Sequence, residues 1–246
     1  NPPAKATAFV GCPDTASAIA LLRAARTSLG PMLSSFEVMW PSFFHYMSEA
    51  TGLGSPLAGR HGVYIILEAT GFEPEATRGS LERLFERAFE DGLVEDGVLA
   101  NSVKEERALW AVRESPAEYE TVLGPVIPFD VGIPIGQMAE AVTRIEAAVK
   151  ALYPSARTLS YGHIGDSNLH VVVNVPEAGR EQPHKQVKAC VYAITRELGG
   201  TVSAEHGIGA IKRDYLAYSR TPAEIRLMRA IKETLDPKGI LNPTKS

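Results

Sequence analysis

The chain has 246 residues, of which 45% are apolar and 22% are charged, and this balance excludes disordered, collagen-like and low-complexity proteins. The 25 basic and 29 acidic residues include no basic run, which argues against nucleic-acid binding. No uninterrupted apolar stretch reaches the length of about 18 residues that predicts a membrane span. Cys12 and Cys190 form neither a disulfide framework nor a CxxC pair. A reducing, cytoplasmic location is therefore expected, with peripheral membrane association through another subunit as an alternative.

The first residues suggest a connection to a preceding domain. The chain starts with Asn1-Pro2-Pro3 instead of methionine, and no basic segment followed by an apolar one predicts a signal peptide. The length suffices for one large domain or two small ones with an ample core. We expect the chain to be a fragment of a longer protein.

The first hundred residues alternate between strand and helix patterns. Strands are predicted at 7–10, 36–40 and 63–68, where β-rich or alternating residues occur. Asp14 is placed to cap a helix that ends at Gly30, and a second helix is predicted over 79–91. The aromatic run 43–47 predicts a short helix, and the Gly- and Pro-rich segment 52–61 predicts a loop.

The second part of the chain continues in the same manner. Apolar residues at spacings of three and four predict helices over 104–117, 137–152, 187–198 and 222–235. Strands are predicted at 126–133, 158–163, 169–175 and 201–204. Because the predicted strands often follow one another as hairpins, the order of strands and helices along the chain favours an α+β fold. We expect a large antiparallel sheet with helices on one face, built from ferredoxin-like units, although the sequence contains no visible internal repeat.

Two histidines flank the turn between two predicted strands. His163 and His170 would lie close together at the end of this hairpin, and two neighbouring imidazoles suit a divalent metal ion. The spacing alone matches no standard metal motif and favours structural histidines. Asp166 and Asn168 are explained most simply as turn residues.

A second group of polar residues lies at 200–209, among several glycines that would let the backbone approach a ligand. Glu205 can supply a third ligand to a metal. If this stretch is extended, the side chain of His206 points the opposite way. His206 is then placed to act as a base across a substrate.

Five sequence blocks resemble the C-terminal domain of FAD-linked oxidases and dehydrogenases, the group of D-2-hydroxyglutarate dehydrogenase, D-lactate dehydrogenase and the glycolate oxidase flavoprotein subunit. They lie at 109–114, 129–134, 161–170, 199–209 and 235–243. The resemblance is close over residues 100–246. The first hundred residues fit only in the order of their strands and helices.

The resemblance implies a role for six residues. His163, His170 and Glu205 would be the ligands of a divalent metal, usually zinc, and His206 would be the base. Arg113 would pair with a substrate carboxylate; without the resemblance, an ion pair with Glu114 or Glu118 explains it better. Asn242 would approach the flavin, or it would only cap a turn.

The resemblance also implies cofactors and partners. The FAD would be bound mainly by an N-terminal domain that is absent here, so residues 1–246 would form a single substrate-binding domain that is inactive alone. The whole protein would oxidise a D-2-hydroxy acid to the 2-oxo acid, transfer the hydride to FAD and pass the electrons to an unidentified acceptor. The exposed docking face would favour homo-oligomers of the isolated chain.

Three positions depart from the pattern of the 2-hydroxyglutarate enzymes. Their threonine, lysine and asparagine, which would contact the second substrate carboxylate, are replaced by Ala117, Pro128 and Val172. We therefore expect a monocarboxylic or more apolar D-2-hydroxy acid as substrate. Two alternatives stay open: a metal-dependent hydrolase, and a binding module that has kept the fold without catalysis.

Overall fold

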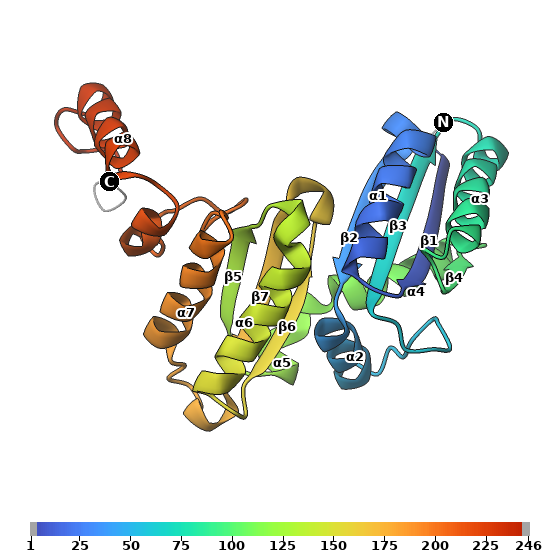
Figure 1. Ribbon diagram of the computed structural model, residues 1–246, viewed down its shortest axis with the longest axis horizontal. Coiled ribbons are helices and arrows are strands. Elements are labelled where there is room, and N and C mark those ends of the chain that lie inside the picture. The colour runs from blue at the N-terminus through green and yellow to red at the C-terminus, as the bar shows by residue number, and fades with distance from the viewer. Residues whose placement is uncertain (1–3, 243–246) are drawn as a thin grey trace.

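The computed structural model describes residues 4–242, and a single antiparallel sheet runs through most of the molecule. The strands lie in the order β4-β1-β3-β2-β6-β7-β5 (Figure 1). Their bounds are β1 (Ala4–Cys12), β2 (Leu33–Met39), β3 (Val63–Gly71), β4 (Asp96–Leu99), β5 (Ile127–Gly132), β6 (Arg157–Gly162) and β7 (Asn168–Asn174). The predicted α+β fold with a large antiparallel sheet is confirmed.

Eight α-helices accompany the sheet within residues 4–242. They are α1 (Thr15–Leu29), α2 (Pro41–Ala50), α3 (Pro74–Glu90), α4 (Val103–Glu114), α5 (Tyr119–Val122), α6 (Met138–Leu152), α7 (His184–Glu197) and α8 (Pro222–Leu235). Asp14 caps α1 by accepting the backbone N–H of Ser17 at 2.7 Å, as predicted. Among the described helices, none has the length and apolar character needed to cross a membrane.

The sheet consists of two ferredoxin-like halves. In the first half, β1-α1-β2-β3-α3-β4 gives the strand order 4-1-3-2. In the second half, β5, α6, β6, β7 and α7 follow in the same sequence, with β7 between β6 and β5. The strand predicted at 201–204 is reduced to a single bridge between Gly132 and Thr201. The repetition therefore exists in topology, although the sequence shows no repeat.

The two halves join where β2 pairs with β6. Only Val38 with Gly162 and Met39 with Tyr161 are paired there, and the backbone N–H of Trp40 donates to Ser160 O at 3.0 Å just beyond. This seam lies at the middle of the sheet, between the blue and yellow strands of Figure 1.

Two apolar layers enclose the sheet. On one face, α1, α3, α6 and α7 form the expected layer of helices and pack with the strands into the larger core cluster. On the other face, α2, α4 and α5 cover part of the sheet with a smaller cluster that includes Phe43, Phe44 and Tyr64. Phe43, Phe44 and Trp40 are buried, so these large aromatic side chains belong to the core.

Some boundaries differ from the predicted ones for local reasons. Strand β4 was not predicted, because it is a four-residue edge strand that contains Gly97 and pairs only with β1. Helix α3 begins at Pro74, five residues earlier than expected, with Pro74 at the position where a missing N–H is tolerated. Helix α4 ends at Glu114 and not at residue 117, since Pro116 cannot continue an α-helix.

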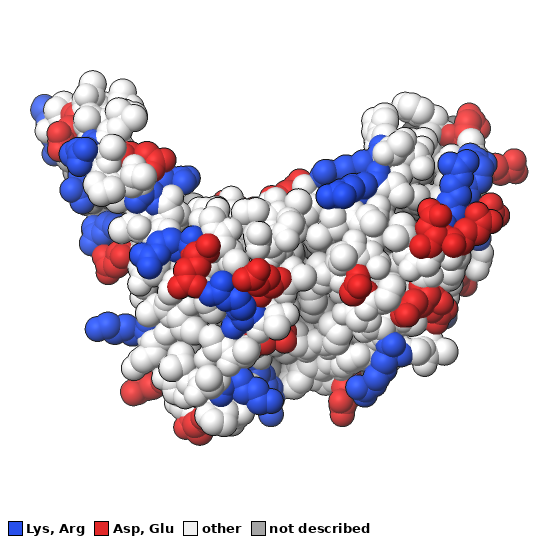
Figure 2. Space-filling model, in the orientation of Figure 1, with Lys and Arg blue, Asp and Glu red and all other residues white. Residues whose placement is uncertain are grey.

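Residues 213–242 leave the sheet and form a projecting arm, made of the 3₁₀ helix η6 (Arg213–Tyr218) and α8 (Figures 1 and 2). No residue of α8 is buried, and Leu227, Ile231 and Leu235 are each more than half exposed. Figure 2 shows a broad hollow between this arm and the far half of the molecule. An amphipathic helix with an uncovered apolar face is the kind of surface that docks against another protein part.

We predict that Gly162→Ala destabilises the protein by about 1–3 kcal/mol, the usual cost of overpacking. A Cβ atom at Gly162 would lie 2.4 Å from the carbonyl oxygen of Asn168, so the β6–β7 hairpin beside the seam would have to shift. Chemical denaturation measures the change. The control is Gly136→Ala, where a Cβ atom meets nothing within 4 Å; equal midpoints for both variants would contradict the prediction.

Candidate functional site

The seam between the two halves carries a cluster of potential metal ligands. His163 follows β6 directly, His170 lies on β7, and Glu205 belongs to the loop after α7. One ligand atom from each lies within 4.8 Å of the others, and His163 Nε2 is 3.7 Å from Glu205 Oε1. The structure thus brings together the three residues that the sequence singled out.

A tight turn makes this proximity possible. The β6–β7 connection contains one 3₁₀ turn (Ile164–Asp166) and Ser167, whose φ of 60° lies in the left-handed region. In the hairpin, Tyr161 faces His170 across the strands. Asp166 and Asn168 serve the turn, as expected from the sequence.

The His170 imidazole is held in its neutral form. Burial, together with the positive charges of His163 and Arg113, lowers its pKa to about 4. A neutral imidazole keeps the lone pair that a metal requires. His170 is therefore suited to ligation at neutral pH.

The residue that sequence reasoning missed is Glu37, a buried glutamate on β2. Its Oε1 lies 2.8 Å from His163 Nδ1. Its Oε2 accepts from Arg113 Nε at 3.0 Å and pairs with Arg113 Nη2 at 2.9 Å. Burial raises the pKa of Glu37, but the His163 hydrogen bond and the Arg113 charge outweigh it and lower the pKa overall. The same hydrogen bond raises the pKa of His163.

Arg113 projects from α4 into this cluster. Its guanidinium carbon lies 4.7 Å from the centre of the Tyr161 ring, and its ion pair is with Glu37 instead of the expected Glu114 or Glu118. The separation of 76 positions between Arg113 and Glu37 hides this pair from any local pattern. The available signal was an acidic residue inside the otherwise apolar strand Phe36–Trp40.

His206 lies on the same side of the cluster as Glu205. Its side chain is 67% exposed, its Nδ1 is 3.7 Å from Asp130 Oδ2, and its ring centre is 6.4 Å from that of His170. The expectation that His206 points away from Glu205 along an extended strand is wrong. The segment bends around Asp130, and ligand atoms of Asp130, Glu205 and His206 approach within 4.8 Å.

Asp130 on β5 is the anchor of this bend. Its Oδ2 accepts the backbone N–H groups of Glu205 at 3.1 Å and His206 at 2.9 Å, and Lys212 Nζ lies 3.4 Å away. Burial raises the pKa of Asp130, but these N–H groups and the Lys212 charge lower it overall. Because the Lys212 ammonium already neutralises this carboxylate, the group of Asp130, Glu205 and His206 is a poor second cation site.

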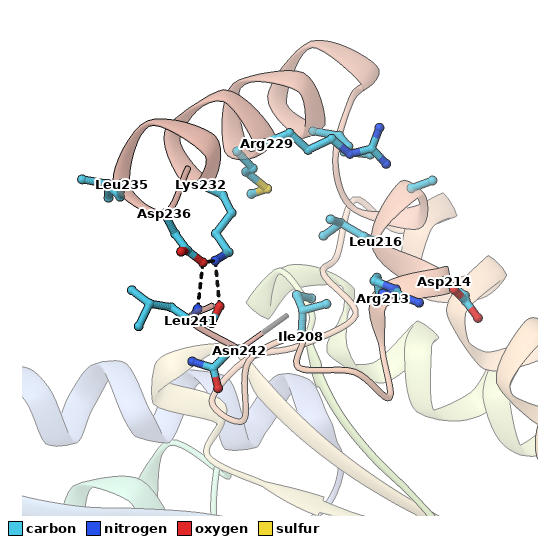
Figure 3. Close-up of a pocket in the computed structure, with 13 residues that line it drawn as sticks. Ile208, Arg213, Asp214, Leu216, Arg229, Lys232, Leu235, Asp236, Leu241 and Asn242 are labelled. Carbon is cyan, nitrogen blue, oxygen red and sulfur yellow. Dashed lines mark hydrogen bonds and ion pairs between the residues drawn. The ribbon is translucent and has the colours of Figure 1, made fainter. Parts of the chain in front are cut away.

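Asn242 lies apart from the cluster, on the projecting arm. It lines a groove of about 800 Å³ between η6 and α8 (Figure 3). The turn before it is fixed by Asp236, which accepts from Leu241 N at 2.9 Å, and by Lys232, which donates to Leu241 O at 2.7 Å. Asn242 itself has a φ of 48°, a conformation that asparagine tolerates in turns. A contact with a flavin stays a prediction.

Asp130→Asn should lower the free energy of unfolding at neutral pH by about 2–3 kcal/mol, because charge-assisted hydrogen bonds are lost and Lys212 keeps no counter-charge. The native pKa of Asp130 is below its unfolded value, so its contribution is complete above that unfolded value and disappears as the pH falls through the native one. Denaturation at several pH values should therefore show a flatter acid limb in the variant. The exposed Asp91→Asn serves as control; matching acid limbs in Asp130→Asn and the parent would rule out this role.

The comparison with known proteins places the chain in a family. The model of the FAD linked oxidases, C-terminal domain, matches residues 1–246. A probable mitochondrial D-2-hydroxyglutarate dehydrogenase of Oryza sativa subsp. indica is 35% identical over 99% of this chain and 43% of its own length. The mitochondrial D-2-hydroxyglutarate dehydrogenase of Bos taurus is 37% identical over 97% of this chain and 43% of its own length. A putative mitochondrial D-lactate dehydrogenase of Schizosaccharomyces pombe is 29% identical over 100% of this chain and 48% of its own length.

A solved structure supports the fold. p-Cresol methylhydroxylase with bound substrate superposes with a TM-score of 0.68 at 13% identity, and the match covers 100% of this chain and 53% of that one. At this identity the likeness concerns the fold alone. The chain spans less than half the length of the three relatives named above. By its sequence, the chain belongs to the family of FAD linked oxidase C-terminal domains.

Proposed function

We propose that this chain is the substrate-binding part of a flavin-dependent enzyme that oxidises a D-2-hydroxy acid to the 2-oxo acid. The observation that carries the proposal is the cluster of His163, His170 and Glu205, with the exposed imidazole of His206 beside it. The relatives of the chain bear the names of D-2-hydroxy acid dehydrogenases. The flavin supplies the hydride acceptor when bound. It would be held mainly by a separate N-terminal domain.

The donor set fits a divalent metal ion. Two imidazoles and one carboxylate are ligands that zinc accepts, and three protein ligands leave a position for substrate. His170 is already neutral and His163 presents Nε2 toward Glu205. When bound there, the ion would polarise the substrate hydroxyl and lower its pKa.

The chain's own residues would orient the substrate and accept its proton. The exposed His206 imidazole borders the cluster, and Asp130 fixes its backbone, so His206 would accept the hydroxyl proton. Arg113 uses Nε and Nη2 on Glu37 and retains further N–H groups. These would pair with the substrate carboxylate.

The flavin domain would dock on the arm side of the molecule. The arm exposes the apolar face of α8, and the hollow in Figure 2 lies between this arm and the other half. Asn242, on the same arm, would then approach the flavin. An uncovered α8 would also promote self-association of the isolated chain.

The surroundings of the cluster favour a substrate with a single carboxylate. Val172 follows His170 by two residues on the same face of β7 and belongs to the apolar cluster with Tyr161. Pro128 is its cross-strand partner. Neither side chain offers a donor to a second carboxylate, and burying an unpaired carboxylate is costly.

The metal proposal predicts near-stoichiometric divalent metal in the purified protein. His163→Ala and His170→Ala should each abolish this content, as measured by mass spectrometry of the metal. His184→Ala, at the start of α7 and outside the cluster, should leave it unchanged. Full metal content in either cluster variant would exclude these residues as ligands.

The substrate proposal predicts that the full-length enzyme has a higher kcat/KM for D-lactate than for D-2-hydroxyglutarate. Restoring a donor with Val172→Asn should shift this ratio toward D-2-hydroxyglutarate by about tenfold, the effect of roughly one charge-assisted hydrogen bond. Steady-state kinetics with both acids measures it. A clear preference of the parent for D-2-hydroxyglutarate would contradict the proposal.

A further inference from the structure

The Glu37 carboxylate is divided between two partners. Among the described residues, the partner of one oxygen, Oε1, is the Nδ1 atom of His163 at 2.8 Å. The other, Oε2, meets Arg113 through Nε at 3.0 Å and Nη2 at 2.9 Å. All three groups are at most partly exposed, since 11% of the Glu37, 13% of the Arg113 and 30% of the His163 side chain is accessible. A carboxylate that accepts at both oxygens in a buried setting has a defined orientation.

We infer that Glu37 is a positioning residue, which fixes the tautomer and the direction of the His163 ring. An ionised carboxylate can only accept hydrogen bonds, so Nδ1 must carry the proton. Whenever the ring is neutral, its lone pair therefore lies at Nε2, the atom that faces Glu205 at 3.7 Å. The inference deepens the proposed function, since Nε2 is the atom that would ligate the metal.

Arg113 compensates the negative charge of the buried Glu37 carboxylate. An isolated carboxylate at this depth would be strongly disfavoured, and the guanidinium compensates it. The Tyr161 ring lies under the guanidinium at 4.7 Å and fixes it in turn. A continuous series of contacts thus runs from Tyr161 through Arg113 and Glu37 to His163, which belongs to the cluster.

The placement of Glu37 follows from the seam. Met39 pairs with Tyr161 and Val38 with Gly162, so the next position along β2, Glu37, comes opposite His163. Glu37 belongs to the first ferredoxin-like half and His163 to the second. The orientation of the second half's histidine is therefore set by a residue of the first half.

Glu68 is a matched control, because it is a buried glutamate whose role is structural alone. Glu68 on β3 is also buried and lies on the same face of the sheet; it pairs with Lys5 at 3.1 Å and accepts from Thr7 at 3.3 Å. It contacts none of the cluster residues in the described part of the chain. Glu68→Gln should cost stability in a way similar to Glu37→Gln without touching His163.

The experiment is ¹⁵N NMR of the imidazoles in metal-free protein labelled at histidine, recorded at alkaline pH, where the rings are neutral. The His163 signals are assigned by their loss in His163→Asn. We expect Nδ1–H in the parent, a gain of Nε2–H in Glu37→Gln, and an unchanged Nδ1–H form in Glu68→Gln. An Nε2–H form in the parent would overturn the inference without any variant. So would a parent-like spectrum in folded Glu37→Gln, or an equal shift in Glu68→Gln.

Zinc titration separates this inference from the proposed function. If the metal site exists, Glu37→Gln should weaken zinc binding by about 10–100-fold, the usual effect of losing such a partner, and Glu68→Gln should not. If the parent binds no zinc, the metal part of the proposed function fails, while the NMR result still decides the role of Glu37. Parent-like zinc affinity in Glu37→Gln would count against the inference.

Discussion

The pairing of β2 with β6 is the constraint on which the rest of the site depends. Each ferredoxin-like half could bury its own helices, but two residue pairs and one further backbone hydrogen bond connect the halves into one sheet. Gly162, the partner of Val38 at this junction, has no room for a side chain, because a Cβ atom there would meet Asn168 of the neighbouring strand β7. The seam brings β2 of one half against the β6–β7 hairpin of the other, and the cluster of His163, His170 and Glu205 forms there.

Two buried carboxylates organise this cluster in different ways. Glu37 orients an imidazole and is neutralised by Arg113. Asp130 anchors a backbone bend and is neutralised by Lys212. In both cases a cation compensates the charge, because an uncompensated carboxylate in the protein interior costs more than its hydrogen bonds return. The groups proposed to meet the substrate, His206 above all, stay accessible while the groups that position them are buried.

On the arm, the local sequence of α8 specifies an amphipathic helix whose apolar face the sheet does not cover. Helix α8 has a complete capping box at Thr221 and Glu224 and a regular apolar stripe, so its local sequence specifies a helix. Its stripe nevertheless faces no layer of the sheet in the described residues. Such a helix is stabilised by tertiary packing more than by propensity, which agrees with the proposed docking of a flavin domain on this side.

The sequence by itself determined the antiparallel α+β fold, the ferredoxin-like order, nearly all helices and the hairpin that joins His163 to His170, because apolar periodicity, caps and turn residues act over short distances. The polar, glycine-rich segment 200–209 pointed to Glu205 and His206 as their companions, and similarity to a family implied the same roles. Only the tertiary structure decided that Arg113 pairs with Glu37, that residues 203–206 bend around Asp130, and that β4 completes the first half. These contacts join residues about 75 positions apart or lie at a sheet edge. No local pattern encodes which buried charge will meet which, because that choice depends on how the two halves come together at the seam.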